Sequence, residues 1–263
     1  MRLLAVQCTA AIALIYSVPA NAGAWNQKQG AGQVIVTGLY SHSAKGFSAD
    51  SEVTNIDDYN KYEAYLLLEY GLTDNITVIV NPSLTHQGSK GRDDDISGLG
   101  YTEAGARYRI GQGSTSVLSM QGTVRIAGET QSGTLAQLYQ VKTEFDARAL
   151  VGKSFTVGAR PGFVDVQGGY RFRSGGPPNE FRADVTLGYR PTNDMLLLAQ
   201  SFNVFSDGRG AAGLNKYRYH NSYLSGVYQL SRKVSVQVGG LMTLSGKNAL
   251  RERGLVTGLW YRF

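Results

Sequence analysis

The chain of 263 residues contains a single cysteine, Cys8, and only six prolines. One thiol cannot form a disulfide within the chain, so an exported product must be stabilised in some other way. The formal net charge of +6 is spread along the sequence rather than gathered in one segment. A protein that binds nucleic acid concentrates its positive charge on one face or helix, so we predict no nucleic-acid partner.

Long hydrophobic runs are also missing after residue 22. A membrane-spanning helix needs about 20 consecutive apolar residues, and the best apolar runs, at residues 66–68 and 195–199, are far shorter. The 33 glycines and 16 tyrosines suit many strands and turns better than helices. We therefore predict an all-β chain with no helical membrane span.

The first 22 residues have the three parts of a secretory signal. Arg2 supplies a positive start, residues 3–18 are mostly apolar, and Ala20, Asn21 and Ala22 form a small-x-small cleavage site. An uncleaved anchor is the weaker alternative, because polar residues interrupt the run and Pro19 ends it. We predict a cleaved signal peptide at residues 1–22 and a mature domain at residues 23–263, from which Cys8 is lost.

Apolar and polar residues alternate along most of the remaining chain. The pattern is clearest at residues 180–190, where Phe181 and Val185 alternate with Arg182 and Asp184. Each such segment has roughly the length that a tilted membrane strand requires. We predict twelve strands, near residues 32–42, 59–70, 76–86, 99–110, 115–128, 141–151, 162–173, 180–190, 195–205, 216–230, 233–245 and 252–263.

The connections between these predicted strands alternate between short and long. Those after even-numbered strands are mostly tight turns, and those after odd-numbered strands are longer and more polar; only the link at residues 152–161 is longer than its class predicts. Soluble sandwiches and lipocalin-like barrels also alternate along their strands, but this loop asymmetry is typical of outer-membrane proteins. We predict a single closed, antiparallel, up-and-down transmembrane β-barrel of about 12 strands.

The apolar faces carry aromatic residues near the ends of the even-numbered strands. Aromatic girdles of this kind mark the membrane interface of β-barrels. The chain also ends inside a strand, which in hydrocarbon must pair with the first strand. The predicted girdle consists of Tyr70, Tyr108, Tyr189, Tyr228, Tyr261 and Phe263.

The opposite faces of the strands carry charges of both signs, which we predict to line the barrel lumen. Arginines outnumber carboxylates in our full set of inward positions, which favours anionic or neutral solutes. Two interpretations stay open: a narrow polar conduit, and a structural network whose charges neutralise one another. The predicted lining residues are Glu63, Glu103, Arg107, Arg109, Arg125, Glu144, Asp146, Arg148, Asp165, Arg171, Arg182 and Asp184.

Two short motifs suggest other chemistry. His220 and Ser222 share one strand face, and the pair resembles the His-x-Ser of outer-membrane phospholipases and lipid deacylases, in which a His activates the Ser hydroxyl. Residues 93–95 are three aspartates in a predicted outer loop, where hard oxygen ligands can hold a divalent cation that bridges lipopolysaccharide phosphates. Consecutive carboxylates are more typical of a solvated loop. We predict no metal site, no cofactor and no enzymatic activity.

Residues 95–110 (DISGLGYTEAGARYRI) resemble the recurring Gly-x-Gly-Asp-x-x-x-Gly-x-Lys/Arg-Tyr hairpin strand of bacterial outer-membrane barrels. The segment is similar in particular to the transporter-like family labelled for the MetA pathway of phenol degradation, although Tyr101 replaces the usual Asp. The C-terminal aromatic resembles the recognition signal for the barrel-assembly machinery. These resemblances imply a Gram-negative outer-membrane barrel that contacts membrane lipid and lipopolysaccharide and moves a small solute.

We therefore predict passive passage of a small solute through a narrow polar channel. A lipid hydrolase that uses His220 and Ser222 is one alternative. A structural or adhesive barrel, which would act through outer loops at residues 43–58 and 87–98, is the other.

Overall fold

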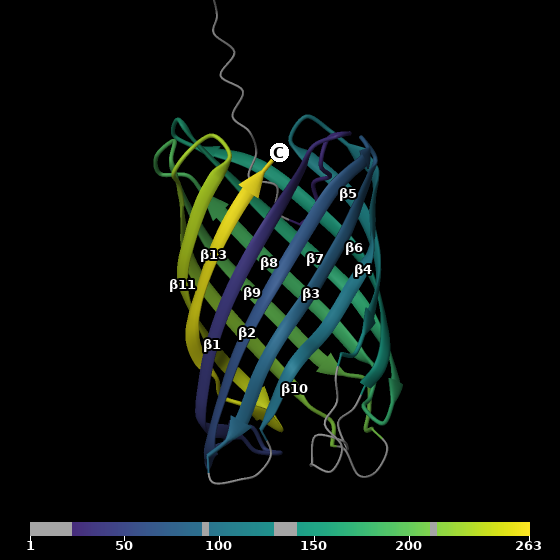
Figure 1. The fold of residues 1–263 in the computed structure, drawn as a ribbon, viewed down its shortest axis with the longest axis vertical. Helices are drawn as coiled ribbons and strands as arrows, with labels where there is room; N and C mark the ends of the chain where they lie inside the picture. The colour runs from purple at the N-terminus through teal and green to yellow at the C-terminus, as the bar shows by residue number, and fades with distance from the viewer. Residues whose placement is uncertain (1–22, 91–94, 129–140, 211–214) are drawn as a thin grey trace, which may run out of the picture.

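The computed structural model of the chain describes residues 23–90, 95–128, 141–210 and 215–263. The alternating pattern produces strands that wrap into one barrel, with the short turns and the C-terminus at the upper end in Figure 1. The strands are β1 (Gly32–Phe47), β2 (Val53–Thr73), β3 (Ile76–Ser89), β4 (Ile96–Gln112), β5 (Ser116–Ile126), β6 (Val141–Val157), β7 (Arg160–Gly175), β8 (Glu180–Tyr189), β9 (Met195–Ser206), β10 (Arg218–Gln229), β11 (Val234–Lys247), β12 (Ala249–Leu250) and β13 (Arg253–Arg262).

The sheet closes on itself because β1 pairs with both β2 and β13. Every neighbouring pair is antiparallel, and β12 is a two-residue strand beside the far end of β1. At the other end of β1, Gly32 and Phe263 exchange two backbone hydrogen bonds of 2.9 and 3.0 Å, which seal the last strand against the first. The predicted twelve-strand, up-and-down barrel is therefore confirmed by the twelve long strands.

The short turns all lie at one end of the barrel, which we call the turn end. The prediction was wrong at residues 152–161, because β6 continues to Val157 and β7 begins at Arg160. Gly158 adopts a φ of +61°, a left-handed conformation that favours glycine, and so closes a two-residue hairpin. This connection thus belongs to the short class after all. The predicted outer loop at 43–58 is also mostly strand, because only residues 48–52 separate β1 from β2.

The two faces of the strands differ as the alternation predicts. On β8, Phe181, Val185 and Leu187 are exposed on the outer wall, whereas Asp184 and Thr186 are buried inside. The terminal strand repeats this split, with Leu255, Leu259, Tyr261 and Phe263 outward and Val256 inward. Within the described part of the chain, no helix is long and apolar enough to cross a membrane.

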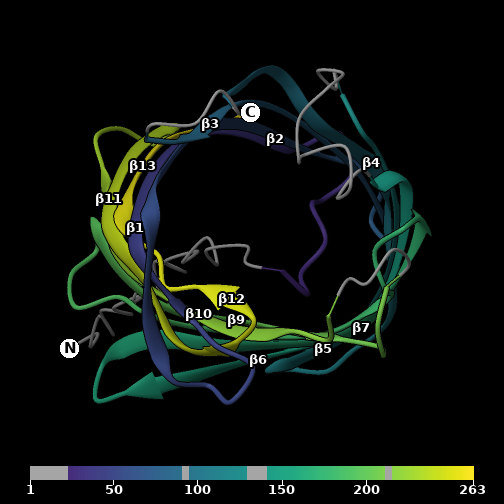
Figure 2. The same ribbon diagram turned by 90° about the horizontal axis from the view of Figure 1, so that it is seen from below.

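The residues before β1 enter the barrel, which the sequence did not predict. Residues 23–31, drawn in purple, cross the inside of the ring in Figure 2. Ala24 is fully buried there, and Gln27 is 5% exposed. We call residues 23–31 the inner segment.

Candidate functional site

The turn end of the interior is filled by an apolar core around Trp25 of the inner segment. Trp25 packs between two clusters of inward side chains and meets Phe163 edge-on at a ring distance of 5.8 Å. A Cβ added to Gly152 would lie 2.6 Å from the Trp25 ring, so this glycine makes room for the indole. The two clusters consist of Ala24, Val117 and Leu150, and of Phe163, Leu196, Leu198 and Val227.

Polar groups on the barrel wall fix the backbone of the inner segment. Arg107 donates to the Trp25 carbonyl at 2.9 Å, and Ser119 donates to the Ala24 carbonyl at 2.7 Å. The backbone N–H of Gln27 donates to Thr77 at 2.9 Å. Because the buried backbone groups of an irregular segment must find partners, these bonds hold the inner segment in one place.

Beyond this core, charges of alternating sign line the strands from β4 to β8. Glu103, Arg125, Glu144 and Arg173 are directly paired across four successive strands, β4 to β7. Asp146, Arg171 and Glu180 form a second paired row from β6 to β8. Opposite charges directly across a strand pair stabilise it, so the register itself favours this arrangement. We call these seven residues the charge ladder.

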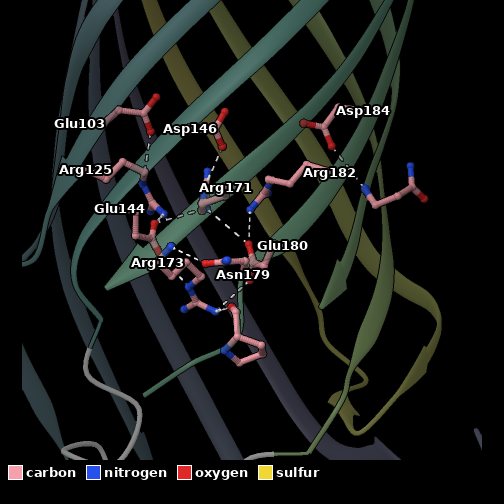
Figure 3. A network of polar contacts seen from close by, with 12 residues as sticks. Glu103, Arg125, Glu144, Asp146, Arg171, Arg173, Asn179, Glu180, Arg182 and Asp184 are labelled. Atoms are coloured by element: carbon pink, nitrogen blue, oxygen red, sulfur yellow. Dashed lines mark hydrogen bonds and ion pairs between the residues drawn. The ribbon is translucent and has the colours of Figure 1, made fainter. Parts of the chain in front are cut away.

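The side chains of the charge ladder point toward one another in Figure 3. Glu144 accepts from Arg125 and from Arg173, the latter at 2.9 Å. Arg171 contacts Asp146 at 2.9 Å, and Arg173 contacts Glu180 at 3.1 Å. The Glu144 side chain is only 2% exposed. Buried charges of this kind persist only when each is paired, and every member of the ladder is.

A loop residue completes this network. Tyr217, just before β10, donates to Glu180 at 2.6 Å and accepts from Arg173 at 2.6 Å. Burial and the neighbouring Glu180 carboxylate raise the pKa of Tyr217. The phenol therefore stays neutral and keeps the proton that it donates.

The opposite wall of the interior carries fewer charges. Lys61 lies 3.2 Å from Glu63 and 3.4 Å from Glu252, which also accepts from Ser41 at 2.9 Å. Most other inward groups on this side are neutral, such as Gln237, which bonds Trp260 at 3.0 Å. One side of the interior therefore carries many charged groups, and the opposite side is largely neutral.

The two walls enclose a cavity of about 780 Å³. The inner segment lies at its turn end, where Gly23 and Phe163 contribute to the lining. Of the predicted lining residues, the cavity wall contains Glu63, Glu103, Arg107, Arg125, Glu144, Arg148, Arg171 and Arg182.

The other four predicted lining residues lie elsewhere. Asp146, Asp165 and Asp184 are buried beneath the side chains that line the cavity. Asp184, for example, accepts a hydrogen bond from the cavity-lining Arg148 at 2.6 Å. Arg109 bonds Asn75 at 2.7 Å at the turn end, outside the cavity.

Sequence reasoning missed several inward groups. It did not count Glu180 and Glu252 among the inward residues, although both lie on the inward face and bond into it. These two carboxylates reduce the expected excess of arginine. It also missed the inner segment, because these nine residues before the first strand carry no periodic signal. The small residues and Trp25 just after the expected cleavage site were the only available sign.

The six predicted girdle residues lie near the turn end. Tyr70, Tyr108, Tyr228, Tyr261 and Phe263 are exposed on the outer wall, and Tyr189 is half-buried. Phe263 stacks with Tyr70 at 6.5 Å and with Tyr261 at 6.1 Å. Phe263 thus joins Tyr70 of β2 to Tyr261 of β13 in one row of aromatic rings.

The His220 motif faces outward, on a wall that is otherwise mostly apolar. His220 Nδ1 lies 2.7 Å from the Asn203 side-chain oxygen, so β9 supplies a partner that the sequence did not reveal. Ser222 follows on the same face, directly opposite Ser201. Within the described residues, no hydrogen bond joins Ser222 to His220.

No group of three potential metal ligands is present in the described ranges. Of the three consecutive aspartates considered for a divalent cation, Asp93 and Asp94 lie outside those ranges.

No family model matches the chain, and no curated protein matches it either. The similarity to the phenol-degradation family that residues 95–110 suggest therefore stays a prediction.

Solved structures do share the fold. An outer membrane channel from Pseudomonas putida F1 has a TM-score of 0.72 at 14% identity, over 91% of this chain and 98% of that chain. The NanC porin has a TM-score of 0.59 at 10% identity, over 88% of this chain and 100% of that one. The translocator domain of the autotransporter NalP from Neisseria meningitidis has a TM-score of 0.53 at 10% identity, over 94% and 91%. At such identities the likeness shows the closed antiparallel barrel fold, which channels and translocators share.

Proposed function

We propose that this protein is an outer-membrane channel through which a small solute passes passively. The observation that carries the proposal is the combination of an apolar outer wall with a charged cavity of about 780 Å³ inside. In water this arrangement exposes many large apolar side chains, whereas in a bilayer it satisfies both faces. The likeness to an outer membrane channel from Pseudomonas putida F1 supports the same function.

The charge ladder acts as the filter. Its arginines and carboxylates stand on one wall, so a passing solute meets both signs within a few ångströms. Rings and rows of charged side chains set the selectivity of many pores. Because the charges are paired, we expect weak selectivity between anions and cations and a preference for small polar solutes.

The inner segment restricts the path. Ala24 and Leu150 are fully buried where it meets the wall, so the turn end of the interior is packed. Passage therefore requires this segment to shift, and we expect brief openings and a low open probability.

Planar-bilayer recording of the refolded protein tests the channel function. We expect discrete current steps at moderate voltage. A complete absence of ion and solute flux at every voltage and pH would remove the channel and leave a structural barrel. An adhesive role has less support than the sequence suggested, since most of residues 43–58 belong to β1 and β2.

A second candidate, lipid hydrolysis, is favoured by one contact. The 2.7 Å bond between Asn203 and His220 Nδ1 would orient the imidazole so that its other nitrogen faces outward. In such a site Ser222 attacks an acyl ester, His220 takes the hydroxyl proton and returns it to the leaving alcohol, and water later releases the fatty acid.

Fatty-acid release from phospholipid vesicles or lipid A tests this second candidate. Release by the native protein that Ser222→Ala abolishes and Ser201→Ala preserves would support it. No release by the native protein, or undiminished release by Ser222→Ala, would remove it.

A further inference from the structure

Asp165 on β7 is a buried carboxylate without a basic side chain beside it. It is 1% exposed, and it accepts hydrogen bonds from the Ala24 backbone N–H at 2.6 Å and from the Gln167 side chain at 2.7 Å. No lysine or arginine of the described ranges lies within ion-pair distance of it. A buried carboxylate is costly without a positive partner.

Two arginines in the surroundings of Asp165 pair with other acids. Arg107 pairs with Glu69 at 2.8 Å, and Arg148 pairs with Asp184 at 2.6 Å. Neither guanidinium is left over for Asp165. The carboxylates of Glu69 and Asp184 are therefore paired with arginines, whereas Asp165 has no basic side chain as its partner among the described residues.

Gly23 lies directly against this carboxylate. A Cβ on Gly23 would be 2.3 Å from Asp165 Oδ1 and 2.4 Å from Gln167 Nε2, and the residue has a φ of +55°. The backbone nitrogen is bonded to the same Cα as this Cβ would be, so it lies within roughly 5 Å of the carboxylate oxygen by standard bond lengths. Only glycine permits this close approach.

Gly23 is also the residue that the expected signal cleavage would make the first of the mature chain. Hydrolysis of the peptide bond between Ala22 and Gly23 consumes one water, leaves a carboxyl group on Ala22 and frees an amino group on Gly23. That amine is mostly protonated at neutral pH, because an exposed α-amino group has a pKa of about 7.7 to 8.0. Before cleavage the same nitrogen is a neutral amide.

We propose that the α-ammonium group of Gly23, created by signal cleavage, is the counter-ion of Asp165 and locks the inner segment inside the barrel. Processing would then complete the interior of the protein as well as release it from the export machinery. The ion pair itself depends only on the processing site and the geometry. Its effect on gating rests on the proposed channel function.

The reactivity of the N-terminal amine tests the ion pair. The exported protein is purified from outer membranes in detergent, and mass spectrometry establishes its first residue. It is then treated with an amine-specific acylating reagent at neutral pH, and labelling of the N-terminal peptide is followed over time. We expect the native amine to react at least about tenfold more slowly than that of Asp165→Asn, since one pKa unit is tenfold in free amine.

Two further variants make the result specific. Glu63→Gln removes an inward carboxylate that pairs with Lys61 instead, and should leave the labelling rate unchanged. Inserting two alanines between Ala22 and Gly23 moves the amine away while Asp165 stays intact. This insertion variant should label as fast as Asp165→Asn, and adding Asp165→Asn to it should have no further effect.

Equal labelling of the native protein and Asp165→Asn would overturn the proposal, as would a mature chain that begins at another residue. If Asp165→Asn does not fold, slow labelling of the insertion variant alone would overturn it. The labelling measurement does not depend on whether the protein conducts ions. If the barrel never conducts but Asp165 still slows labelling of the amine, the ion-pair proposal stands and the channel proposal fails.

Discussion

The turn end of the barrel interior and the wall between β4 and β8 are held together by different chemistry. At the turn end, a segment from outside the sheet brings Trp25 into an apolar core, and its hydrogen bonds come from scattered wall residues. The charge ladder belongs to the sheet itself, with acids and bases paired in strand register. The difference implies that the turn end can open without breaking the sheet, whereas the ladder cannot be removed without straining it.

Removing residues 23–28 of the inner segment should have the largest effect on conductance. The protein refolded as residues 29–263 lacks Trp25 and Gln27 but keeps every strand. We expect single-channel conductance to rise several-fold and openings to become long. The substitution Asp50→Ala in the exposed β1–β2 connection is the control and should change neither quantity. Unchanged conductance after the deletion would show that the restriction lies elsewhere.

The next largest effect is on stability, and it is expected when the charge ladder is broken at its centre. Glu144→Gln leaves Arg125, Arg171 and Arg173 without their shared carboxylate. Loss of a buried ionic partner typically costs about 3–5 kcal/mol. Glu103→Gln is the matched control, because this more exposed residue forms an ion pair with Arg125 alone among the described residues, and a partly solvated pair contributes about 1 kcal/mol or less.

Urea unfolding in lipid vesicles, followed by tryptophan fluorescence, compares the two variants. The free energy of unfolding should fall more for Glu144→Gln than for Glu103→Gln. Equal losses would mean that the ladder acts as separate pairs rather than as one network.

How much of the fold and of the candidate site could be predicted depends on how far along the chain each sequence pattern extends. Alternation over ten residues predicted which side chains face inward, and residues such as Asp184 and Phe181 lie where it placed them. The pairing of Glu144 with Arg173 depends on strand register, which alternation leaves open by steps of two residues. The position of Trp25 depends on contacts with Val117 and Phe163, far along the chain, and no local pattern specifies it.

A smaller effect should follow from crowding the indole. Gly152→Val places side-chain atoms where the Trp25 ring lies, whereas Gly168→Val adds them where no atom lies within 4 Å of the new Cβ. We expect Gly152→Val to raise the open probability, less than the deletion does, because most of the inner segment keeps its bonds. Bilayer recordings of both variants measure this. An identical change in open probability for the two substitutions would show that Trp25 does not control gating.

The smallest expected effect is on selectivity. Glu103 and Arg125 lie 3.2 Å apart, and both line the cavity. Glu103→Gln should shift the reversal potential in a salt gradient toward anion preference, and Arg125→Gln should shift it toward cation preference. Shifts of the same sign would show that the ladder does not face the ion path.

The central claim is that the apolar wall of this barrel contacts lipid while its polar face lies inside. The chain has only two tryptophans, Trp25 and Trp260, and both pack against the inner core. Quenching by phospholipids with brominated acyl chains therefore distinguishes the two faces. Native fluorescence should resist quenching, and Leu187→Trp on the outer wall should add a strongly quenched component. Native tryptophans quenched as strongly as the added one, or an outer-wall tryptophan that lipid does not quench, would contradict the account.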